Sequence, residues 1–294
     1  MLKKQNAALA SIFSNTLLII MKLVVGVFTG AISIISEAIH SMTDLIAAIV
    51  AFIAVRIADR PPDKNHPYGH EKVENISGVI EAILIFIAAA FIVFEAVKKI
   101  ISHERVENLL LGVVVMFISG VVNMVVSSYL YKVAKKEDSI ALEADALHLK
   151  VDVYTSFGVG AGLLLIFILK AVTKLEVFYY LDPAIAILVA LFILKEAGEM
   201  FIKAYAPLID SKISDSEIEA IETIIKNYPK EGIGYHDIRT RKAGKIKHVD
   251  FHLTTPKNFT IEQAHAICDE LEKQIEFEIH NSRILIHIEP DEVK

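Results

Sequence analysis

The chain has 294 residues, a formal net charge of −6 and 54% hydrophobic residues, with a mean hydropathy of +0.49 and no tryptophan. This composition is too apolar for an ordinary soluble protein, and the modest charge gives no indication of nucleic-acid binding. The apolar residues gather in runs of about 20 or more, the length that crosses the hydrocarbon core of a bilayer as a helix. From about residue 210 onward the composition is that of a soluble domain.

The apolar runs predict six membrane-spanning helices, at roughly 7–29, 31–57, 75–100, 108–133, 139–170 and 178–206. The first run has no obvious cleavage site, so we expect it to be retained as a span. An even number of spans puts both termini on one side. Lys and Arg are more numerous near the span ends of that side, which predicts a multi-pass protein with both termini in the cytoplasm. We expect it in the cell (inner) membrane.

The last part of the chain predicts a small α+β domain. Pro207 and Asp210 end the sixth span, and Ser214-x-x-Glu217 opens a new helix as a capping box. The single Cys268 fits a reducing cytoplasm. We therefore expect a membrane domain at 1–209, with a cytoplasmic His-containing loop at 58–73, and a cytoplasmic domain at 210–294.

The expected elements of this second domain are a helix, two strands joined by a turn at Ala243-Gly244, a second helix and a third strand. The order αββαβ predicts an open-faced sandwich of the metallochaperone or ferredoxin-like kind, with the helices on one face of the sheet. The approximate ranges are 214–228, 233–242, 246–255, 260–279 and 282–289, and Thr260-x-x-Gln263 opens the second helix as another capping box.

Two predicted spans contain the same pattern, acid-Ala-aliphatic-His-x-x-x-Asp. It places His40 and Asp44 in the second span and His148 and Asp152 in the fifth, each pair on one helix face. Counted from the span ends, both pairs lie about 14–20 Å deep in a hydrocarbon core of roughly 30 Å. Ionisable groups at this depth are unfavourable without a partner or a watery cavity, so the pattern indicates a functional site.

If the two spans face each other, their side chains supply two imidazoles and two carboxylates. This ligand set suits a tetrahedral Zn²⁺ site and also accepts Cd²⁺, Co²⁺ or Fe²⁺, whereas Mn²⁺ and Mg²⁺ prefer oxygen ligands alone. The spans run antiparallel, so each His should lie beside the Asp of the other helix. Protons compete with metal for the imidazoles, which offers a basis for exchange. Interhelical His–Asp hydrogen bonds without metal are the structural alternative.

Two further groups of potential ligands lie outside the spans. Asp63, His66 and His70 share the loop at 58–73. In the strand at 246–255, alternation directs Val249, Phe251 and Leu253 toward the helices and His252 to the other face. His287 and Glu289 of the last strand share that open face, and His236 and His265 are further candidates. Solvated surface histidines explain these residues equally well.

The paired His-x-x-x-Asp motifs, the loop motif Asp63-x-x-His66-x-x-x-His70 and the segment GYHDIRT, in this order and in these elements, resemble the cation diffusion facilitator family. The resemblance covers nearly the whole chain and is strongest to bacterial zinc-transporting members. It implies a homodimer that exports divalent metal from the cytoplasm in exchange for protons, with 210–294 as its cytoplasmic metal-binding dimerisation domain. Zn²⁺ would be both transported and structural, and no organic cofactor is implied.

Residue by residue, the resemblance implies three metal sites. The transport site falls on His40, Asp44, His148 and Asp152, and the loop site on Asp63, His66 and His70. The cytoplasmic site falls on His236, His252, His265, His287 and Glu289, where the most similar members have Asp at the last position. The resemblance also implies a charge interlock between Lys72 and Asp210. Manganese-selective members typically replace the His of the second span, so His40 favours zinc.

Two other classes of function compete with transport. A metal-dependent hydrolase would need three protein ligands, an open coordination position and a placed general base, whereas four ligands arriving as two matched pairs predict a closed site. The chain also lacks His-Glu-x-x-His. A membrane-anchored metal sensor would use the histidines of the second domain, but it would leave the ligands at the membrane midplane without a purpose. We therefore expect a transporter and no enzymatic activity.

Overall fold

The computed structural model describes residues 2–29, 32–102, 109–172, 181–229 and 232–291, and some side chains within these ranges, that of His40 among them, are not described. Contacts divide the chain into two compact units, Met1–Tyr205 and Ala206–Lys294. The first unit is helical, and the second contains a three-stranded sheet with two long helices. Each unit is described by itself.

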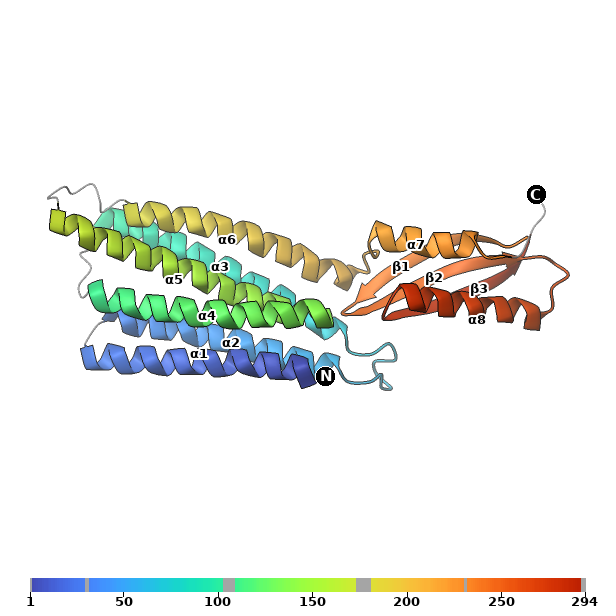
Figure 1. The fold of residues 1–294 in the computed structure, drawn as a ribbon, viewed down its shortest axis with the longest axis horizontal. Helices are drawn as coiled ribbons and strands as arrows, with labels where there is room; N and C mark the ends of the chain where they lie inside the picture. Colours follow the sequence, from blue (N-terminus) through green and yellow to red (C-terminus); the bar gives the residue numbers. More distant parts are fainter. Residues whose placement is uncertain (1, 30–31, 103–108, 173–180, 230–231, 292–294) are drawn as a thin grey trace. The chain divides into compact units, whose positions relative to one another are not determined.

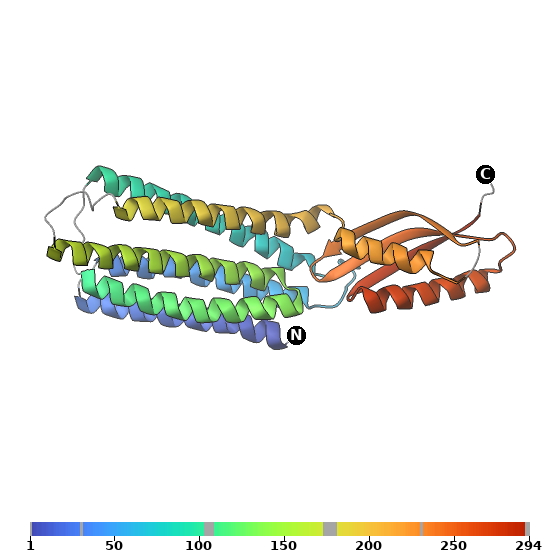
Figure 2. The same cartoon turned by 45° about the horizontal axis from the view of Figure 1, so that its top comes forward.

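The helical unit contains six long helices, which lie side by side in a bundle (Figures 1 and 2). The most extensive packing joins α4 to α5, α3 to α6 and α1 to α2. The helices coincide with the six predicted apolar stretches to within a few residues, because apolar length and helix length are the same signal in a membrane chain. Their bounds are α1 Leu2–Thr29, α2 Ile32–Ala58, α3 Lys72–Ser102, α4 Leu109–Glu137, α5 Ile140–Val172 and α6 Leu181–Tyr205.

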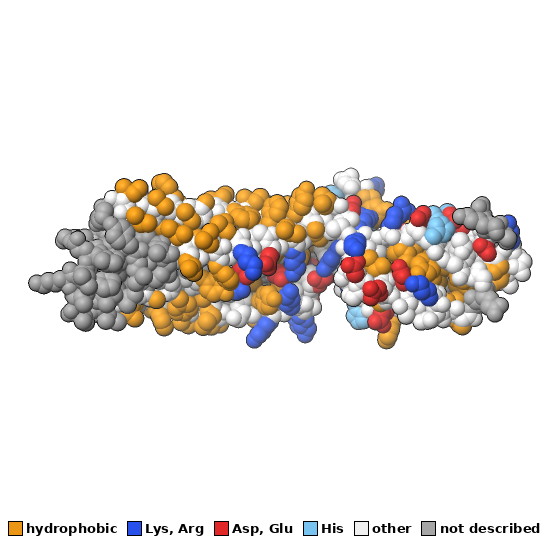
Figure 3. Space-filling view, turned by 90° about the horizontal axis from the view of Figure 1, so that it is seen from above, with side chains coloured by type: hydrophobic (Ala, Val, Ile, Leu, Met, Phe, Trp, Pro, Cys, Tyr) orange, Lys and Arg blue, Asp and Glu red, His pale blue; other side chains and the backbone are white. Residues whose placement is uncertain are grey.

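The distribution of side chains in this bundle is that of a membrane protein. Large apolar side chains such as Phe13 and Val27 are about 70% exposed, at 71% and 70%, while Ser11, Asn15 and Asn123 are buried. Hydrophobic side chains accordingly cover much of the described helical surface in Figure 3. Apolar side chains exposed over so much of a helical surface, with polar side chains buried inside, are typical of contact with lipid, so they place the bundle in a bilayer.

Within the described residues, three stretches are long and apolar enough to cross a membrane by length and composition: Lys3–Val25, Lys72–Lys98 and Val113–Glu137. They fall in α1, α3 and α4. Helix α5 is not among them, and its N-terminal half contains three acidic residues, Glu143, Asp145 and Asp152. Six membrane crossings remain a prediction.

The second unit begins with the short 3-10 helix η2 (Ala206–Ile209) and α7 (Asp215–Lys226), followed by β1 (Gly234–Ala243), β2 (Ile246–Thr255), α8 (Ile261–Glu278) and β3 (Ser282–Pro290). The strand order is β1-β2-β3, with β1 antiparallel and β3 parallel to β2. This confirms the predicted αββαβ order. Both predicted capping boxes are present, at Ser214 and at Thr260, which is why both helices begin where the sequence predicts.

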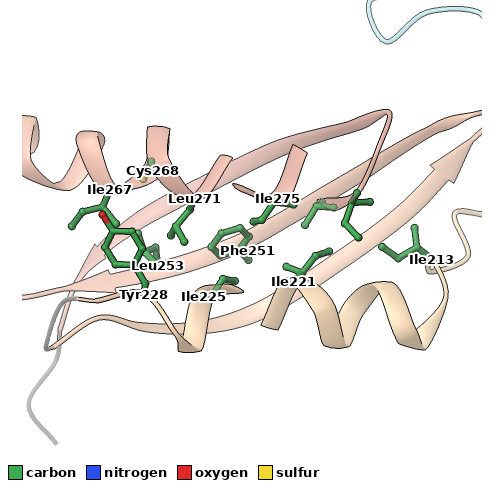
Figure 4. Packing of buried hydrophobic residues seen from close by; sticks show 12 residues of the cluster. Ile213, Ile221, Ile225, Tyr228, Phe251, Leu253, Ile267, Cys268, Leu271 and Ile275 are labelled. Atoms are coloured by element: carbon green, nitrogen blue, oxygen red, sulfur yellow. The ribbon is translucent and has the colours of Figure 1, made fainter. Parts of the chain in front are cut away.

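The core of this unit lies between the sheet and the two helices (Figure 4). Val249, Phe251 and Leu253 of β2 are at most 1% exposed and pack with Ile221 of α7 and Leu271 of α8. Ile284, Ile286 and Ile288 of β3 pack against the same cluster. The alternation of the strands therefore directs apolar residues to the helices, as predicted, and leaves the other sheet face to polar side chains.

Candidate metal centres

A group of three potential metal ligands lies inside the helical bundle. Asp44 comes from α2, and His148 and Asp152 lie one turn apart on α5. Their ligand atoms all lie within 4.8 Å of one another. Asp44 and His148 are only 4% and 6% exposed. The positions that the sequence spaces 104 residues apart thus converge, because α2 packs on α5.

The geometry of this group matches the predicted lateral pairing. His148 Nε2 lies 3.0 Å from Asp44 Oδ1, so the His of one helix contacts the Asp of the other. The second imidazole nitrogen of His148, Nδ1, is buried and has no hydrogen-bond partner among the described residues. The side chain of His40 lies outside the described residues, so its place as a fourth ligand remains a prediction.

Two polar side chains of helix α1 hydrogen-bond to α2 beside this group. Asn15 Nδ2 donates to the carbonyl oxygen of Asp44 at 3.4 Å. Lys22, which is 5% exposed, donates from Nζ to Ser41 Oγ at 2.8 Å, one turn before Asp44. Sequence analysis did not single out Lys22, although a lysine in the middle of an apolar run is a signal that could have identified it.

The end of the bundle at which α1 begins is closed by a buried ionic cluster. Lys4 and Glu74 are both 3% exposed and hydrogen-bonded to each other. Lys4 Nζ also lies 3.8 Å from Asp59 at the end of α2, and Ser139 before α5 donates to Glu74. The cluster therefore joins the ends of four helices. Removing one partner would leave a buried charge uncompensated, which costs about 3–5 kcal/mol.

The predicted loop residues also come together. His66 Nδ1 lies 3.2 Å from Asp63 Oδ1, and His70 Nε2 lies 3.3 Å from Asp63 Oδ2. Hydrogen bonds from the backbone N–H groups of His66 and Asn65, together with the His66 side chain, hold the pKa of Asp63 below its ordinary value. The three ligand atoms lie within 4.8 Å of one another. The loop is preorganised as a three-ligand group on an exposed surface.

In the second unit, Glu289 connects three histidines on the open face of the sheet. Its carboxylate lies 2.9 Å from His252 Nδ1, 3.4 Å from His236 Nε2 and 3.5 Å from His287 Nε2. The register explains this, because His252 is paired with His236 on one side and with His287 on the other. The adjacent ring centroids are 4.9 and 4.8 Å apart.

Sequence analysis missed one potential ligand of this histidine group, Asp237. It also included His265, which lies on another element. Asp237 forms a potential ligand group with His236 and His252. It lies at a strand irregularity with φ of 53°, which turns its side chain out of the regular alternation. His265 lies on α8, where it pairs with Asp269 at 3.6 Å. No described contact brings His265 to the other three histidines.

The two residues of the predicted charge interlock belong to different units. Lys72 begins α3, and Asp210 follows η2, where its Oδ1 lies 3.5 Å from Arg241 Nη1. The interlock between Lys72 and Asp210 remains a prediction.

A lipid-facing helical bundle that encloses a His/Asp ligand group, followed by a separate His-bearing α+β domain, defines an integral membrane protein that handles metal cations. Two family models cover almost the whole chain: the cation efflux transmembrane domain matches residues 8–209, and the cytoplasmic domain of cation efflux proteins matches residues 213–291. The chain belongs to the cation diffusion facilitator family, whose members are cation efflux transporters. The C-terminal unit is accordingly the cytoplasmic domain.

Relatives match along nearly the whole chain. An uncharacterised transporter of Methanocaldococcus jannaschii is 34% identical over 95% of this chain and 95% of its own length. An uncharacterised transporter of Synechocystis is 34% identical over 89% of this chain and 82% of its own length. The cation-efflux pump FieF of Shewanella oneidensis is 29% identical over 98% and 94% of the two chains. A solved structure of the candidate zinc transporter CzrB matches 27% of this chain at 30% identity and a TM-score of 0.26, and it covers 99% of that chain.

Proposed function

We propose that this protein exports Zn²⁺ from the cytoplasm in exchange for protons, as a homodimer in the inner membrane with both termini in the cytoplasm. The observation that carries the proposal is the convergence of Asp44, His148 and Asp152 within 4.8 Å inside the bundle. Two carboxylates and an imidazole form a ligand set for a divalent transition metal. Membership of the cation efflux family supports transport over static binding.

The geometry supports an exchange mechanism. His148 Nε2 and Asp44 Oδ1 lie 3.0 Å apart, so in the absence of metal the pair can share a proton. A metal ion binds the same atoms only when that proton has left, which makes metal and proton mutually exclusive. Alternating access then follows when the occupied site opens to the other side of the membrane, where protons displace the metal.

Zinc is the cargo that the ligand chemistry favours. A tetrahedral site with imidazole and carboxylate ligands suits Zn²⁺, whereas Mn²⁺ and Mg²⁺ prefer oxygen ligands in an octahedral arrangement. Cd²⁺, Co²⁺ and Fe²⁺ are alternative cargoes for the same donors. His40 completes the four-ligand set in the proposal.

The other ligand groups have supporting roles in the proposal. Asp63, His66 and His70 bind metal near the cytoplasmic mouth of the transporter. His236, His252, His287 and Glu289 bind metal in the cytoplasmic domain, where His265 from the second protomer can contribute a ligand and thereby stabilise the dimer. The match to a family model of this domain supports the assignment. Lys72 and Asp210 form the charge interlock, which acts as a pivot between the two protomers.

Metal flux into proteoliposomes tests the transport site. We expect zinc accumulation driven by an imposed pH gradient in the unaltered protein, and a loss of flux of at least about 100-fold in His148→Ala, which removes a direct ligand. His280→Ala is the matched control, because His280 is an exposed histidine outside all three groups. Full flux in His148→Ala would refute the site.

A membrane-anchored metal sensor is the alternative. It would bind metal through the cytoplasmic histidines and carry nothing across. Radiolabelled Zn²⁺ distinguishes the two, because a sensor gives saturable binding in proteoliposomes without accumulation above the number of binding sites. The buried Asp44 and His148 argue against it, since a sensor has no use for ligands inside the bundle.

A further inference from the structure

Two fully buried acidic side chains in the helical unit are not used by the proposed transport site. Glu81 on α3 and Asp145 on α5 are both 0% exposed. Ser77 donates to Glu81 Oε1 at 3.4 Å, and Ser11 donates to Asp145 Oδ1 at 3.2 Å. The second oxygen of each carboxylate, Glu81 Oε2 and Asp145 Oδ2, is buried without a hydrogen-bond partner among the described residues. Buried polar atoms are normally satisfied, so these two oxygens indicate a ligand.

The two carboxyl groups lie beside the transport site. Glu81 interacts electrostatically with both Asp145 and His148, and Asp145 interacts with His148 and Asp44. Asp145 precedes His148 by one turn of α5, about 4.5 Å along the helix. It therefore lies closer than His148 to the end of the bundle at which α5 begins.

At this end of the bundle α6 ends and the chain continues into the second unit. Asn75 near the start of α3 donates to the carbonyl oxygen of Ala204 near the end of α6 at 3.4 Å, and α6 leads directly into the second unit. The starts of α1, α3 and α5 also meet here through Lys4, Glu74 and Ser139. Asp145, five residues into α5, therefore lies nearer to this end of the bundle than His148 does.

The acids around the site outnumber the charges of one divalent ion. Asp44, Asp152, Glu81 and Asp145 are four acids, and one divalent ion at the transport site compensates only two of them. His148 interacts electrostatically with Glu81 and Asp145, but its Nε2 already lies 3.0 Å from Asp44 Oδ1. Two ionised carboxylates without a compensating charge carry a large desolvation penalty in the bundle.

We propose that Glu81 and Asp145 form a second divalent-cation site, an inner station that receives the ion before it passes to Asp44, His148 and Asp152. The station offers only carboxylate and hydroxyl oxygens, the latter from Ser11 and Ser77. Oxygen ligands alone accept Mn²⁺ as well as Zn²⁺, so the station does not select the metal and selection falls to the histidine-containing site. The proposal rests on the transport function, because the station supplies the transport site.

Counting bound metal tests the station without measuring transport. The full chain in lipid nanodiscs is dialysed against Mn²⁺, and the bound ions per chain are counted by elemental analysis. We expect Glu81→Gln and Asp145→Asn each to bind one ion fewer than the unaltered chain. Both substitutions preserve side-chain volume and introduce no charge, so we expect both variants to fold, and their thermal unfolding checks this.

Glu143→Gln is the matched control. It lies two residues from Asp145 on the same helix, and its carboxylate is already paired with Lys135 and Lys203 at 3.2 and 2.5 Å. We expect this variant to bind the same number of ions as the unaltered chain. If Glu81→Gln and Asp145→Asn also bind that number, the station does not exist.

Infrared spectroscopy provides a second readout. If the pair holds protons instead of a metal, a protonated-carboxyl band persists at saturating Mn²⁺ and disappears in Glu81→Gln and Asp145→Asn, which would overturn the station. A band that is lost when Mn²⁺ binds supports it. The two proposals fail separately: unchanged zinc flux in His148→Ala contradicts the transport site, whereas unchanged metal counts in Glu81→Gln and Asp145→Asn contradict the station.

Discussion

The same ligand chemistry occurs in two very different surroundings in this protein. In the bundle, His148 and Asp44 are 6% and 4% exposed and lie on helices that also form the core of the membrane domain. In the cytoplasmic domain, the side chains of His236 and His287 are 46% and 64% exposed on an open sheet face. Buried ionisable ligands carry a desolvation penalty that exposed ones do not.

This difference separates the roles that the two groups can have. The buried ligands are unfavourable for stability and are retained only if their position is needed, which a path across the membrane explains. The exposed ligands are almost neutral for folding and are free to recruit metal or a second protomer from the cytoplasm. The predictions below test this division, from the largest expected effect to the smallest.

Neutralising the buried carboxylates should have the largest effect. We expect Asp44→Asn and Asp152→Asn each to lower zinc flux at least about 100-fold, because each removes a direct ligand and half of the charge that compensates the ion. Flux in proteoliposomes with an imposed pH gradient measures this. Asp63→Asn, in the exposed loop, should retain most of the flux, and equal losses in all three variants would remove the distinction between buried and exposed ligands.

The apolar core of the cytoplasmic domain should be next in sensitivity. Phe251 is 1% exposed, so Phe251→Ala should lower the free energy of unfolding of this domain by about 3–5 kcal/mol. Phe277 is 80% exposed, and Phe277→Ala should change it by less than about 0.5 kcal/mol. Denaturant unfolding monitored by circular dichroism compares the two variants. Similar changes would mean that the sheet and helices do not pack as described.

The thiol of Cys268 reports on the same core. Burial raises its pKa to about 11, assisted by the negative charges of Glu272 and Asp269. At mildly alkaline pH the thiolate is then roughly 100-fold less populated than for an exposed cysteine. Thiol labelling should be slow in the native protein and should accelerate in denaturant. Rapid labelling without denaturant would contradict the buried position.

The exposed histidines should affect assembly more than transport. We expect His252→Ala and His287→Ala to weaken zinc-dependent dimerisation of the cytoplasmic domain roughly 10–100-fold, as the loss of ligands does, while zinc flux falls only a few-fold. Analytical ultracentrifugation with and without Zn²⁺ measures dimerisation, with His280→Ala as the control. Loss of flux equal to that of His148→Ala would make the cytoplasmic ligands part of the transport path.

The smallest effect is expected at the first helix of the cytoplasmic domain. Ser214→Ala removes the side chain that caps α7 and should lower the free energy of unfolding of the domain by about 1 kcal/mol.

Partial burial raises the pKa of Glu217, but hydrogen bonds from Lys247 and Ser214 outweigh this and hold the pKa below its ordinary value.

A lowered carboxyl pKa in the folded state means that Glu217 stabilises the domain at pH values above the ordinary carboxyl pKa. This contribution is lost as the pH falls through the lowered pKa. In Glu217→Gln, the decline of stability in acid should be shallower than in the unaltered domain. Identical pH profiles of the two would show that the contact with Lys247 does not persist in solution.

The sequence by itself determined the elements of this protein. Apolar runs predicted all six helices of the bundle to within a few residues, and alternation in 246–255 predicted which strand residues face the helices. Capping boxes at Ser214 and Thr260 predicted where α7 and α8 begin. These signals are local, since each depends on residues only a few positions apart.

Only the tertiary structure decided which distant residues meet. Asp44 and His148 come together because α2 packs on α5, and Glu289 connects three histidines because β3 pairs in parallel with β2 in one register. In the sequence, Glu81 is a single acid in an apolar stretch with no motif around it. Only the packing of the bundle buries it and brings it within electrostatic range of Asp145. Asp237 leaves the strand alternation only because of an irregularity in β1. Contacts between elements depend on packing and register, which local patterns do not specify.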